Sequence, residues 1–284
     1  MEKIVNDISC GVCVGDDEEK DAVRPLIRLR GIINQFGTQR VHDDLNLDIL
    51  KGEILALVGG SGTGKSVLFR TILGLNKPFS GRILFGDDER NILSLNDKDL
   101  YAIKKNWGVL FQNGALFSSQ SVIENVMLPM REHLDLSEAT MRELAEIKLQ
   151  LVGLPARAGA KYPSELSGGM MKRAALARSI ALDPPLLFLD EPTAGLDPIS
   201  AAAFDKLIKN LQEALNLTVV IITHDLDTLV SICDRIAVLL DQNVTVGTLD
   251  EIMQTDHPWI QKYFHGPRMR AAQNTKAMQI MEQK

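Results

Sequence analysis

The sequence has few cysteines and no long hydrophobic run, and each absence excludes a class of protein. Three cysteines among 284 residues are too few for a disulfide framework. Cys10 and Cys13 form a CxxC pair, but no further zinc ligands or redox context accompany them, so we interpret them as thiols in a flexible leader. No hydrophobic run reaches the roughly 18 to 20 residues that span a bilayer. We therefore expect any membrane role to come through a partner.

Positive charge is also not in excess. The chain has 37 acidic and 31 basic residues and a formal net charge of −6, which argues against nucleic acid as a partner because phosphate-backbone binding needs a basic surface. Residues 1–25 are acidic and without periodicity, so we predict a weakly ordered extension there. This segment lacks the features of a signal peptide, and we expect the chain to stay on the cytoplasmic side.

Short hydrophobic strands alternate with helices from about residue 26 onward, which predicts an α/β fold. Two nearly continuous hydrophobic runs, 186–189 and 218–222, suit strands of a parallel sheet that are buried on both faces. Earlier strands are expected at 26–33, 41–49, 53–58 and 82–85. Helices are expected from a Ser121–Glu124 capping box to Met130, and over 136–152, 168–182 and 198–215.

A phosphate-binding loop follows the hydrophobic strand Ile54–Val58 and opens a helix over 66–73. Its pattern is GxxxxGK[ST]. Glycines let backbone N–H groups curl around phosphate oxygens, and the helix N-terminus adds partial positive charge. We assign Lys65 to the β- and γ-phosphates of ATP and Ser66 to Mg²⁺. The whole loop is expected to bind the nucleotide: Gly59, Gly60, Ser61, Gly62, Thr63, Gly64, Lys65 and Ser66.

Two acids end the hydrophobic run at 186–189. Successive side chains of a strand point in opposite directions, so Asp190 and Glu191 can face different groups. We assign Asp190 to the Mg²⁺ shell and Glu191 to polarising the water that attacks the γ-phosphate. A solvated strand end would explain the acids equally well without the phosphate loop upstream.

The segment Leu166–Met170, LSGGM, closely resembles the signature of ABC ATPases, which is usually LSGGQ. Other marks of that family follow in the expected order and spacing over about residues 26–250. These are Phe36 with Gly37, Gln112 at the end of a strand over 109–111, Gly195-Leu196-Asp197, and His224 after the strand over 218–222. The resemblance implies a P-loop NTPase (RecA-like) core with an antiparallel β subdomain and an inserted α-helical subdomain at about 113–181.

In the ABC ATPases, which this chain resembles, the signature of one subunit contacts the nucleotide bound by the other. Ser167, Gly168 and Gly169 begin a helix and so form an anion site. The family places this site against the γ-phosphate that the other subunit holds. The resemblance therefore implies a homodimer that ATP closes.

The resemblance also implies roles for single residues. His224 would donate a hydrogen bond to the γ-phosphate, and Gln112 would contact the Mg²⁺ shell and report to the helical subdomain. Asp197 would cross the dimer interface. Phe36 would pack against adenine, although an aromatic that merely packs against its turn stays an alternative.

Met170 departs from the signature glutamine and cannot supply its amide hydrogen bonds. This variant, together with the stretches 111–117 and 121–126, resembles the ATPases of MCE-type lipid transporters, such as the bacterial Mla phospholipid system. That resemblance implies three partners, namely an integral membrane permease, an MCE-domain lipid-binding protein and a STAS-domain protein. It also implies a peripheral location at the cytoplasmic face of the inner membrane. Another solute importer or exporter remains an alternative.

The tail over 251–284 has a hydrophobic stripe at i, i+4 spacing, formed by Trp259 with Tyr263 and Ile260 with Phe264. Docking onto the chain's own core and docking onto a second protomer or a partner are both open. We interpret the tail as a C-terminal extension with a docking role. Cutting the chain after about Asp250 should then leave ATP binding intact and weaken assembly.

Two further ABC classes fit less well. ATPases that act on nucleic acid or ribosomes carry a long insertion or two cassettes, and this chain has one cassette with room for one compact helical subdomain. A regulatory module that binds ATP without hydrolysis is disfavoured because Lys65, Glu191 and His224 are all present.

Overall fold

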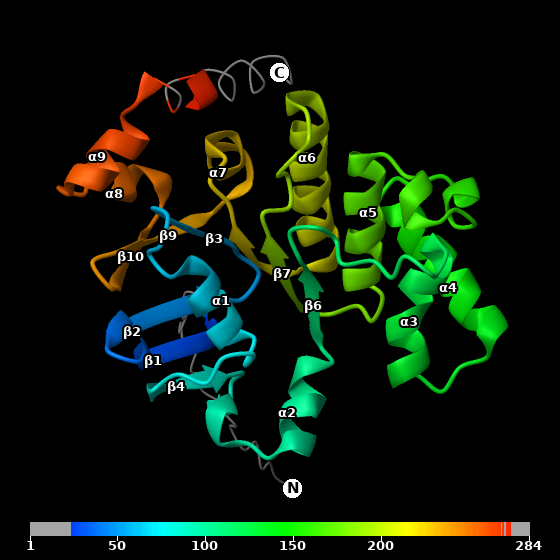
Figure 1. The fold of residues 1–284 in the computed structure, drawn as a ribbon, viewed down its shortest axis with the longest axis horizontal. Coiled ribbons are helices and arrows are strands. Elements are labelled where there is room, and N and C mark those ends of the chain that lie inside the picture. The colour runs from blue at the N-terminus through cyan, green and yellow to red at the C-terminus, as the bar shows by residue number, and fades with distance from the viewer. Residues whose placement is uncertain (1–23, 268, 270, 274–284) are drawn as a thin grey trace, which may run out of the picture.

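The computed structural model describes residues 24–267, 269 and 271–273. The paired cysteines and nearly all of the predicted extension over 1–25 lie outside the described residues. Within them the strands form two sheets, one of four strands and one of six (Figure 1). No helix in this part of the chain has both the length and the hydrophobicity to cross a membrane.

The four-stranded sheet is antiparallel and has the order β2-β1-β4-β5. Its strands are β1 (Pro25–Phe36), β2 (Gln39–Leu50), β4 (Ser80–Phe85) and β5 (Arg90–Asn91). The strands predicted over 26–33, 41–49 and 82–85 are confirmed, and each extends by a few residues. Gly37 has φ +59 in the turn between β1 and β2, a conformation that favours glycine.

The six-stranded sheet has the order β10-β9-β3-β8-β7-β6. Its strands are β3 (Ile54–Gly59), β6 (Trp107–Leu110), β7 (Leu186–Asp190), β8 (Thr218–Ile222), β9 (Arg235–Leu240) and β10 (Asn243–Gly247). All neighbours pair in parallel except β9 with β10. The two continuous hydrophobic runs are strands β7 and β8, and residues 186–189 and 218–222 are buried throughout, as predicted.

The hairpin of β9 and β10 has no counterpart in the sequence-based prediction. Its turn residues Asp241 and Gln242 both have positive φ, of 49° and 66°. Two-residue hairpin turns need this conformation and usually contain glycine or asparagine. The turn has neither, so the signal that marks such hairpins is missing.

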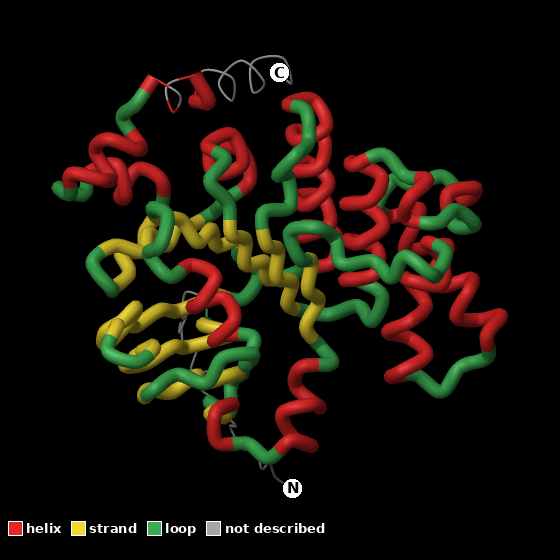
Figure 2. Tube along the Cα trace, viewed as in Figure 1, coloured by secondary structure: helices red, strands yellow, loops and turns green. Residues whose placement is uncertain are grey.

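Helices cover both faces of the six-stranded sheet (Figures 1 and 2). Helix α1 (Lys65–Ile72) lies between the two sheets, where its buried side chains share one hydrophobic cluster with strands of both. Helix α2 (Asp97–Lys104) precedes β6. Three short 3₁₀ turns are η1 (Ile92–Ser94), η2 (Ala156–Ala158) and η3 (Pro163–Glu165).

The other face of the sheet belongs to a second hydrophobic cluster, which reaches a separate helical block. That block contains α3 (Val122–His133), α4 (Glu138–Leu151) and α5 (Gly168–Ser179). The capping box predicted at Ser121 and Glu124 is confirmed. Helix α5 ends at Ser179, three residues before the predicted Leu182, and residues 180–182 form a turn instead.

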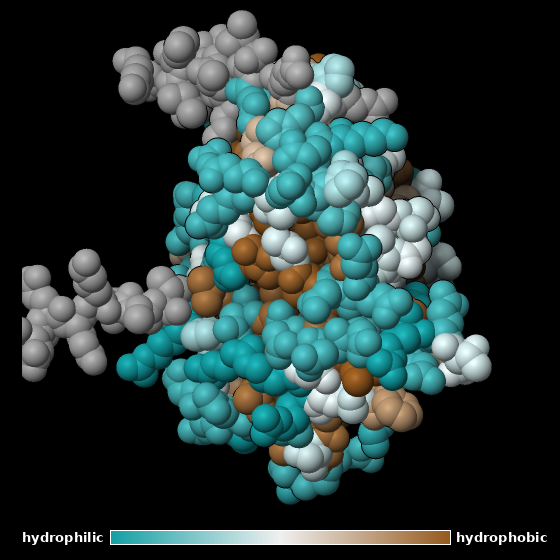
Figure 3. All heavy atoms as spheres, turned by 90° about the vertical axis from the view of Figure 1, so that its left-hand side faces the viewer, coloured by the Kyte–Doolittle hydropathy of each residue, from teal (hydrophilic) through white to brown (hydrophobic). Residues whose placement is uncertain are grey.

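Further helices follow the block in the described part of the chain. Helix α6 (Pro198–Leu215) begins with the predicted pair of Asp197 as N-cap and Pro198 as first residue. The others are α7 (Leu226–Ile232), α8 (Leu249–Gln254) and α9 (Pro258–Phe264). Figure 3 shows the side of the molecule near α8 and α9, where hydrophilic side chains surround a hollow with hydrophobic ones at its floor.

The stripe predicted on the tail lies on α9. Ile260 and Phe264 are fully buried and belong to the chain's own hydrophobic cluster. Of the two alternatives for these residues, the structure shows packing within the chain. A cut after Asp250 would remove this part of the core, so it cannot test docking cleanly.

Candidate functional site

The phosphate loop connects the end of β3 to the start of α1, as its sequence context predicted. Strand β3 lies between β8 and β9, so the loop leaves the carboxyl edge at the middle of the parallel sheet. Lys65 Nζ donates to the carbonyl oxygens of Gly59 at 2.7 Å and Gly60 at 2.8 Å. Burial lowers the pKa of Lys65, and the charge of Glu191 opposes that shift. The ammonium group of Lys65 is thus hydrogen-bonded to carbonyl oxygens of its own loop.

Strand β2 of the antiparallel sheet packs closely against this loop at Gly64. Gly64 has φ +93, and a Cβ there would come within 2.4 Å of Val41 Cγ1 and 2.6 Å of His42 Nε2. Only glycine fits such a close approach. His42 is fully buried, and its Nδ1 lies 3.0 Å from Asn34 Nδ2. Burial lowers the pKa of His42 to about 4, so its imidazole is neutral at neutral pH.

The two acids lie at the carboxyl end of β7, two strands from β3. Asp190 is the last residue of the strand. Burial and then the charge of Glu191 raise the pKa of Asp190, while Arg70 and Lys172 oppose the shift. Glu191 has φ +48, and its N–H donates to the carbonyl of Ile222 at 2.9 Å. A left-handed conformation is uncommon for glutamate, so the strand turns sharply at this residue.

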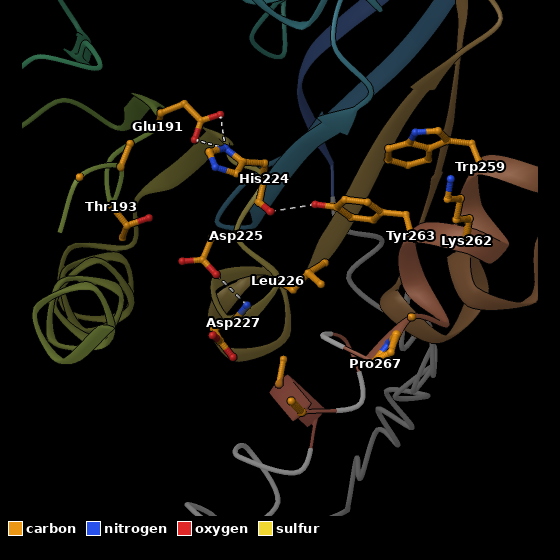
Figure 4. A pocket seen from close by; sticks show the side chains of 15 residues that line it. Glu191, Thr193, His224, Asp225, Leu226, Asp227, Trp259, Lys262, Tyr263 and Pro267 are labelled. Atoms are coloured by element: carbon orange, nitrogen blue, oxygen red, sulfur yellow. Dashed lines mark hydrogen bonds and ion pairs between the residues drawn. The ribbon is translucent and has the colours of Figure 1, made fainter. Parts of the chain in front are cut away.

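His224 follows β8, the strand between β3 and β7. Its Nδ1 lies 2.9 Å from Glu191 Oε1 and 2.8 Å from Oε2 (Figure 4). The phosphate loop, both acids and His224 therefore come from the carboxyl ends of three adjacent strands. This edge of a parallel sheet is where α/β folds bind ligands.

Lys172 was not recognised in the sequence. It lies in α5 with 7% of its surface exposed, and its Nζ donates to the carbonyls of Gln112 and Glu191, the latter at 3.1 Å. Burial lowers its pKa, and the charges of Asp190 and Glu191 oppose this. Gln112 itself is exposed, two residues after β6 ends. Lys172 thereby connects three parts of the site, but nothing in its local sequence distinguishes it from an ordinary helix lysine.

The signature residues lie at the start of α5. Ser167 is the N-cap, and its Oγ accepts a hydrogen bond from the N–H of Met170 at 3.3 Å. Gly168 lies close to Leu196, since a Cβ on it would come within 3.9 Å of Leu196 Cδ2. The phosphate loop opens α1 and the signature opens α5, so the two segments are held by separate helices on opposite faces of the six-stranded sheet.

Two more of the predicted site residues, Asp197 and Phe36, lie at the ends of secondary-structure elements. Asp197 caps α6 by accepting from the N–H of Ser200 at 3.0 Å, and hydrogen bonds to Ser200 lower the pKa of Asp197. Phe36 is the last residue of β1, and 55% of its surface is exposed. Its ring is therefore accessible for stacking.

A cavity of about 1080 Å³ opens beside Glu191 and His224 (Figure 4). Its other wall comes from α9, through Trp259, Lys262 and Tyr263. The sequence indicated a hydrophobic stripe on α9 but no contact with the catalytic edge of the sheet.

Comparison with known proteins adds to this geometry. A family model described as ABC transporter matches residues 42–194. The intermembrane phospholipid transport system ATP-binding protein MlaF of Haemophilus influenzae is 43% identical over 242 residues, which are 85% of this chain and 90% of that protein. A probable ribonucleotide transport ATP-binding protein, mkl, of Mycobacterium leprae is 38% identical over 86% of this chain and 70% of that protein.

A solved structure of similar fold is the ATP-binding cassette MJ0796, described as a dimer in a post-hydrolysis state bound to ADP and Pi. It superposes with a TM-score of 0.70 at 30% identity, and the match covers 78% of this chain and 98% of that one. That protein binds a hydrolysed nucleotide with the same fold.

Proposed function

Because this chain belongs to the ABC transporter family and is an ATPase, we propose that it drives phospholipid transport between the inner and outer membranes. The observation that carries the chemistry is the convergence of Lys65, Glu191 and His224 on one sheet edge. The observation that supports the cargo is the 43% identity to a phospholipid transport ATPase along 90% of that protein.

The loop over 59–66 binds the phosphates of ATP. Lys65 exchanges the carbonyls of Gly59 and Gly60 for β- and γ-phosphate oxygens, which are stronger acceptors because they are charged. Phe36 stacks on adenine. Ser66, Asp190 and Gln112 hold Mg²⁺, an oxygen ligand set of the kind that this ion takes together with nucleotide phosphates. Mg²⁺ neutralises charge on the phosphates when it is bound.

Hydrolysis requires the contact between Glu191 and His224 to open. Glu191 then polarises the attacking water, and His224 donates to the γ-phosphate. Lys172, which holds the carbonyls of both Gln112 and Glu191, keeps the two segments in register during this change.

Two copies of the chain close on two ATP molecules. Ser167, Gly168 and Gly169 of one copy complete the phosphate site of the other, and Asp197 lies at the interface. Met170 packs its side chain against the hydrophobic cluster, so the N–H groups and the serine hydroxyl carry the contact to ATP. The dimer binds a membrane permease at the cytoplasmic face of the inner membrane, together with an MCE-domain protein and a STAS-domain protein.

The test is purification of the full chain from its native membrane, followed by identification of the subunits and lipids that accompany it. We expect a permease, an MCE-domain protein and phospholipid. The reconstituted complex should move phospholipid between vesicles with ATP, and the same complex with Glu191→Gln should not. A different permease that carries ribonucleotides or another solute would overturn the cargo and leave the ATPase assignment intact.

A further inference from the structure

Helix α9 places two stacked aromatic rings against two loops of the ATP site. The rings of Trp259 and Tyr263 lie 4.6 Å apart with an interplanar angle of 13°. Trp259 faces the phosphate loop, since a Cβ on Gly60 would come within 3.4 Å of its Nε1. Tyr263 faces His224, which follows the neighbouring strand β8 (Figure 4). Helix α9, which is far from β3 in the sequence, therefore contacts both the phosphate loop and the segment that follows β8.

The contact with His224 is a hydrogen bond to its backbone. The hydroxyl of Tyr263 donates to the carbonyl oxygen of His224 at 2.9 Å. Burial, with smaller contributions from the charges of Asp225 and Glu191, raises the pKa of Tyr263 to about 12. The hydroxyl is thus protonated at neutral pH and acts as a donor.

Tyr263 is held in place by the core. Its neighbours Ile260 and Phe264 are fully buried, and the rings of Tyr263 and Phe264 meet edge to face with centroids 5.0 Å apart. By contrast, residues 223–225 form a short irregular connection between β8 and α7. The hydrogen bond from the fixed Tyr263 hydroxyl therefore restricts the backbone positions that this short connection can take.

We propose that Tyr263 is a positioning residue for ATP hydrolysis, and that its hydroxyl holds the backbone of His224 so that the imidazole can reach the γ-phosphate. The imidazole swings from Glu191 toward the nucleotide while the Tyr263 bond keeps its Cα in place. This inference rests on the proposed role of His224 and does not depend on the cargo.

The test is Tyr263→Phe, which removes one oxygen atom and keeps the ring stack. A hydrogen bond of this kind contributes on the order of 1 kcal/mol, so kcat for ATP should fall about three- to tenfold. The dissociation constant for ATP should stay unchanged, because the phosphate loop is intact. The melting temperature should fall by no more than about 4 °C, because the buried face of α9 is intact. Tyr101→Phe is the matched control, since its hydroxyl contacts His133 on a remote, exposed surface.

A double-mutant cycle separates positioning from a general structural effect. Single-turnover hydrolysis is measured for the full chain with Tyr263→Phe, His224→Ala and both changes. If Tyr263 acts through His224, its substitution has no further effect once the imidazole is gone. An unchanged kcat, or an equal loss in the His224→Ala background, overturns the proposal. If His224→Ala alone hydrolyses ATP normally, the role of His224 in the proposed function fails instead.

Discussion

Glu191 and His224 are hydrogen-bonded partners, with His224 Nδ1 2.9 Å from Glu191 Oε1. The two residues come from the ends of neighbouring strands β7 and β8. Glu191, which we assign to the attacking water, and His224, which we assign to the γ-phosphate, are therefore hydrogen-bonded to each other. ATP must compete with this pair, which links nucleotide binding to a rearrangement at the edge of the sheet.

Replacing Glu191 by Gln should keep ATP bound and stop turnover. The amide still accepts a hydrogen bond from His224, but it cannot act as a base toward water. We expect kcat to fall by about two orders of magnitude or more, with ATP affinity preserved and a stable ATP-bound dimer. Steady-state ATPase assays and size-exclusion chromatography with ATP measure the two effects, and rapid turnover by this variant would contradict the assignment.

Replacing Lys65 by Ala should weaken ATP binding about tenfold or more, because it removes a charged donor to the β- and γ-phosphates. Adenosine, which has no phosphates, should bind to the variant and the native chain alike. Isothermal titration with both ligands makes the comparison. A matched loss for adenosine would indicate general damage to the fold rather than a phosphate contact.

Mixing two inactive variants tests whether the signature acts in trans. Ser167→Arg blocks the anion site, and Lys65→Ala damages the phosphate loop. In a mixed dimer both lesions fall in one composite site and the other site is intact, so an equal mixture should regain roughly a quarter of native sites. If each site is built within one chain, the mixture stays as inactive as its components.

His42 should make the fold less stable in acid. Its pKa is about 4 in the folded chain, against 6.5 as the ordinary value, so the unfolded chain binds more protons between these pH values. Stability is therefore lost as pH falls from about 6.5 to 4. His42→Gln should lessen the loss between pH 7 and pH 5 by about 2 kcal/mol. Urea unfolding at both pH values measures this, and identical losses in both chains would contradict it.

Asp205 should make the fold less stable as pH rises, which is the opposite pH dependence to that of His42. Burial, together with the charges of Asp225 and Asp227, raises its pKa from 3.8 to about 7, although a hydrogen bond from Thr228 at 2.8 Å opposes this. Its contribution to stability is full below pH 3.8 and is lost as pH rises through 7. The free energy of unfolding of the native chain should therefore fall by about 3 kcal/mol between pH 5 and pH 8 because of this carboxylate, and Asp205→Asn should remove that fall.

The control for Asp205 is Asp87→Asn, which changes the same carboxylate at an exposed position. That variant should follow the native chain at both pH values. An Asp205→Asn chain whose stability still falls in parallel with the native one would show that this carboxylate is not responsible.

Local sequence was sufficient to predict a loop between β3 and α1, the strand that ends at Asp190, and the caps of α3 and α6. Each of these depends on residues close together in the chain, where glycine conformation, capping and alternation of side chains operate. The same information predicted the parallel sheet, because continuous hydrophobic runs suit only strands that are covered on both faces.

The contacts of Lys172, His42 and Tyr263 depended on the tertiary fold. Lys172 meets Gln112 across 60 positions, and Tyr263 meets His224 across 39. No local pattern marks such a pair, because a lysine or a tyrosine on a helix has the same propensity whether it faces solvent or another segment. Packing alone decides which polar atoms lose their water and must find each other, and only the folded chain defines that packing.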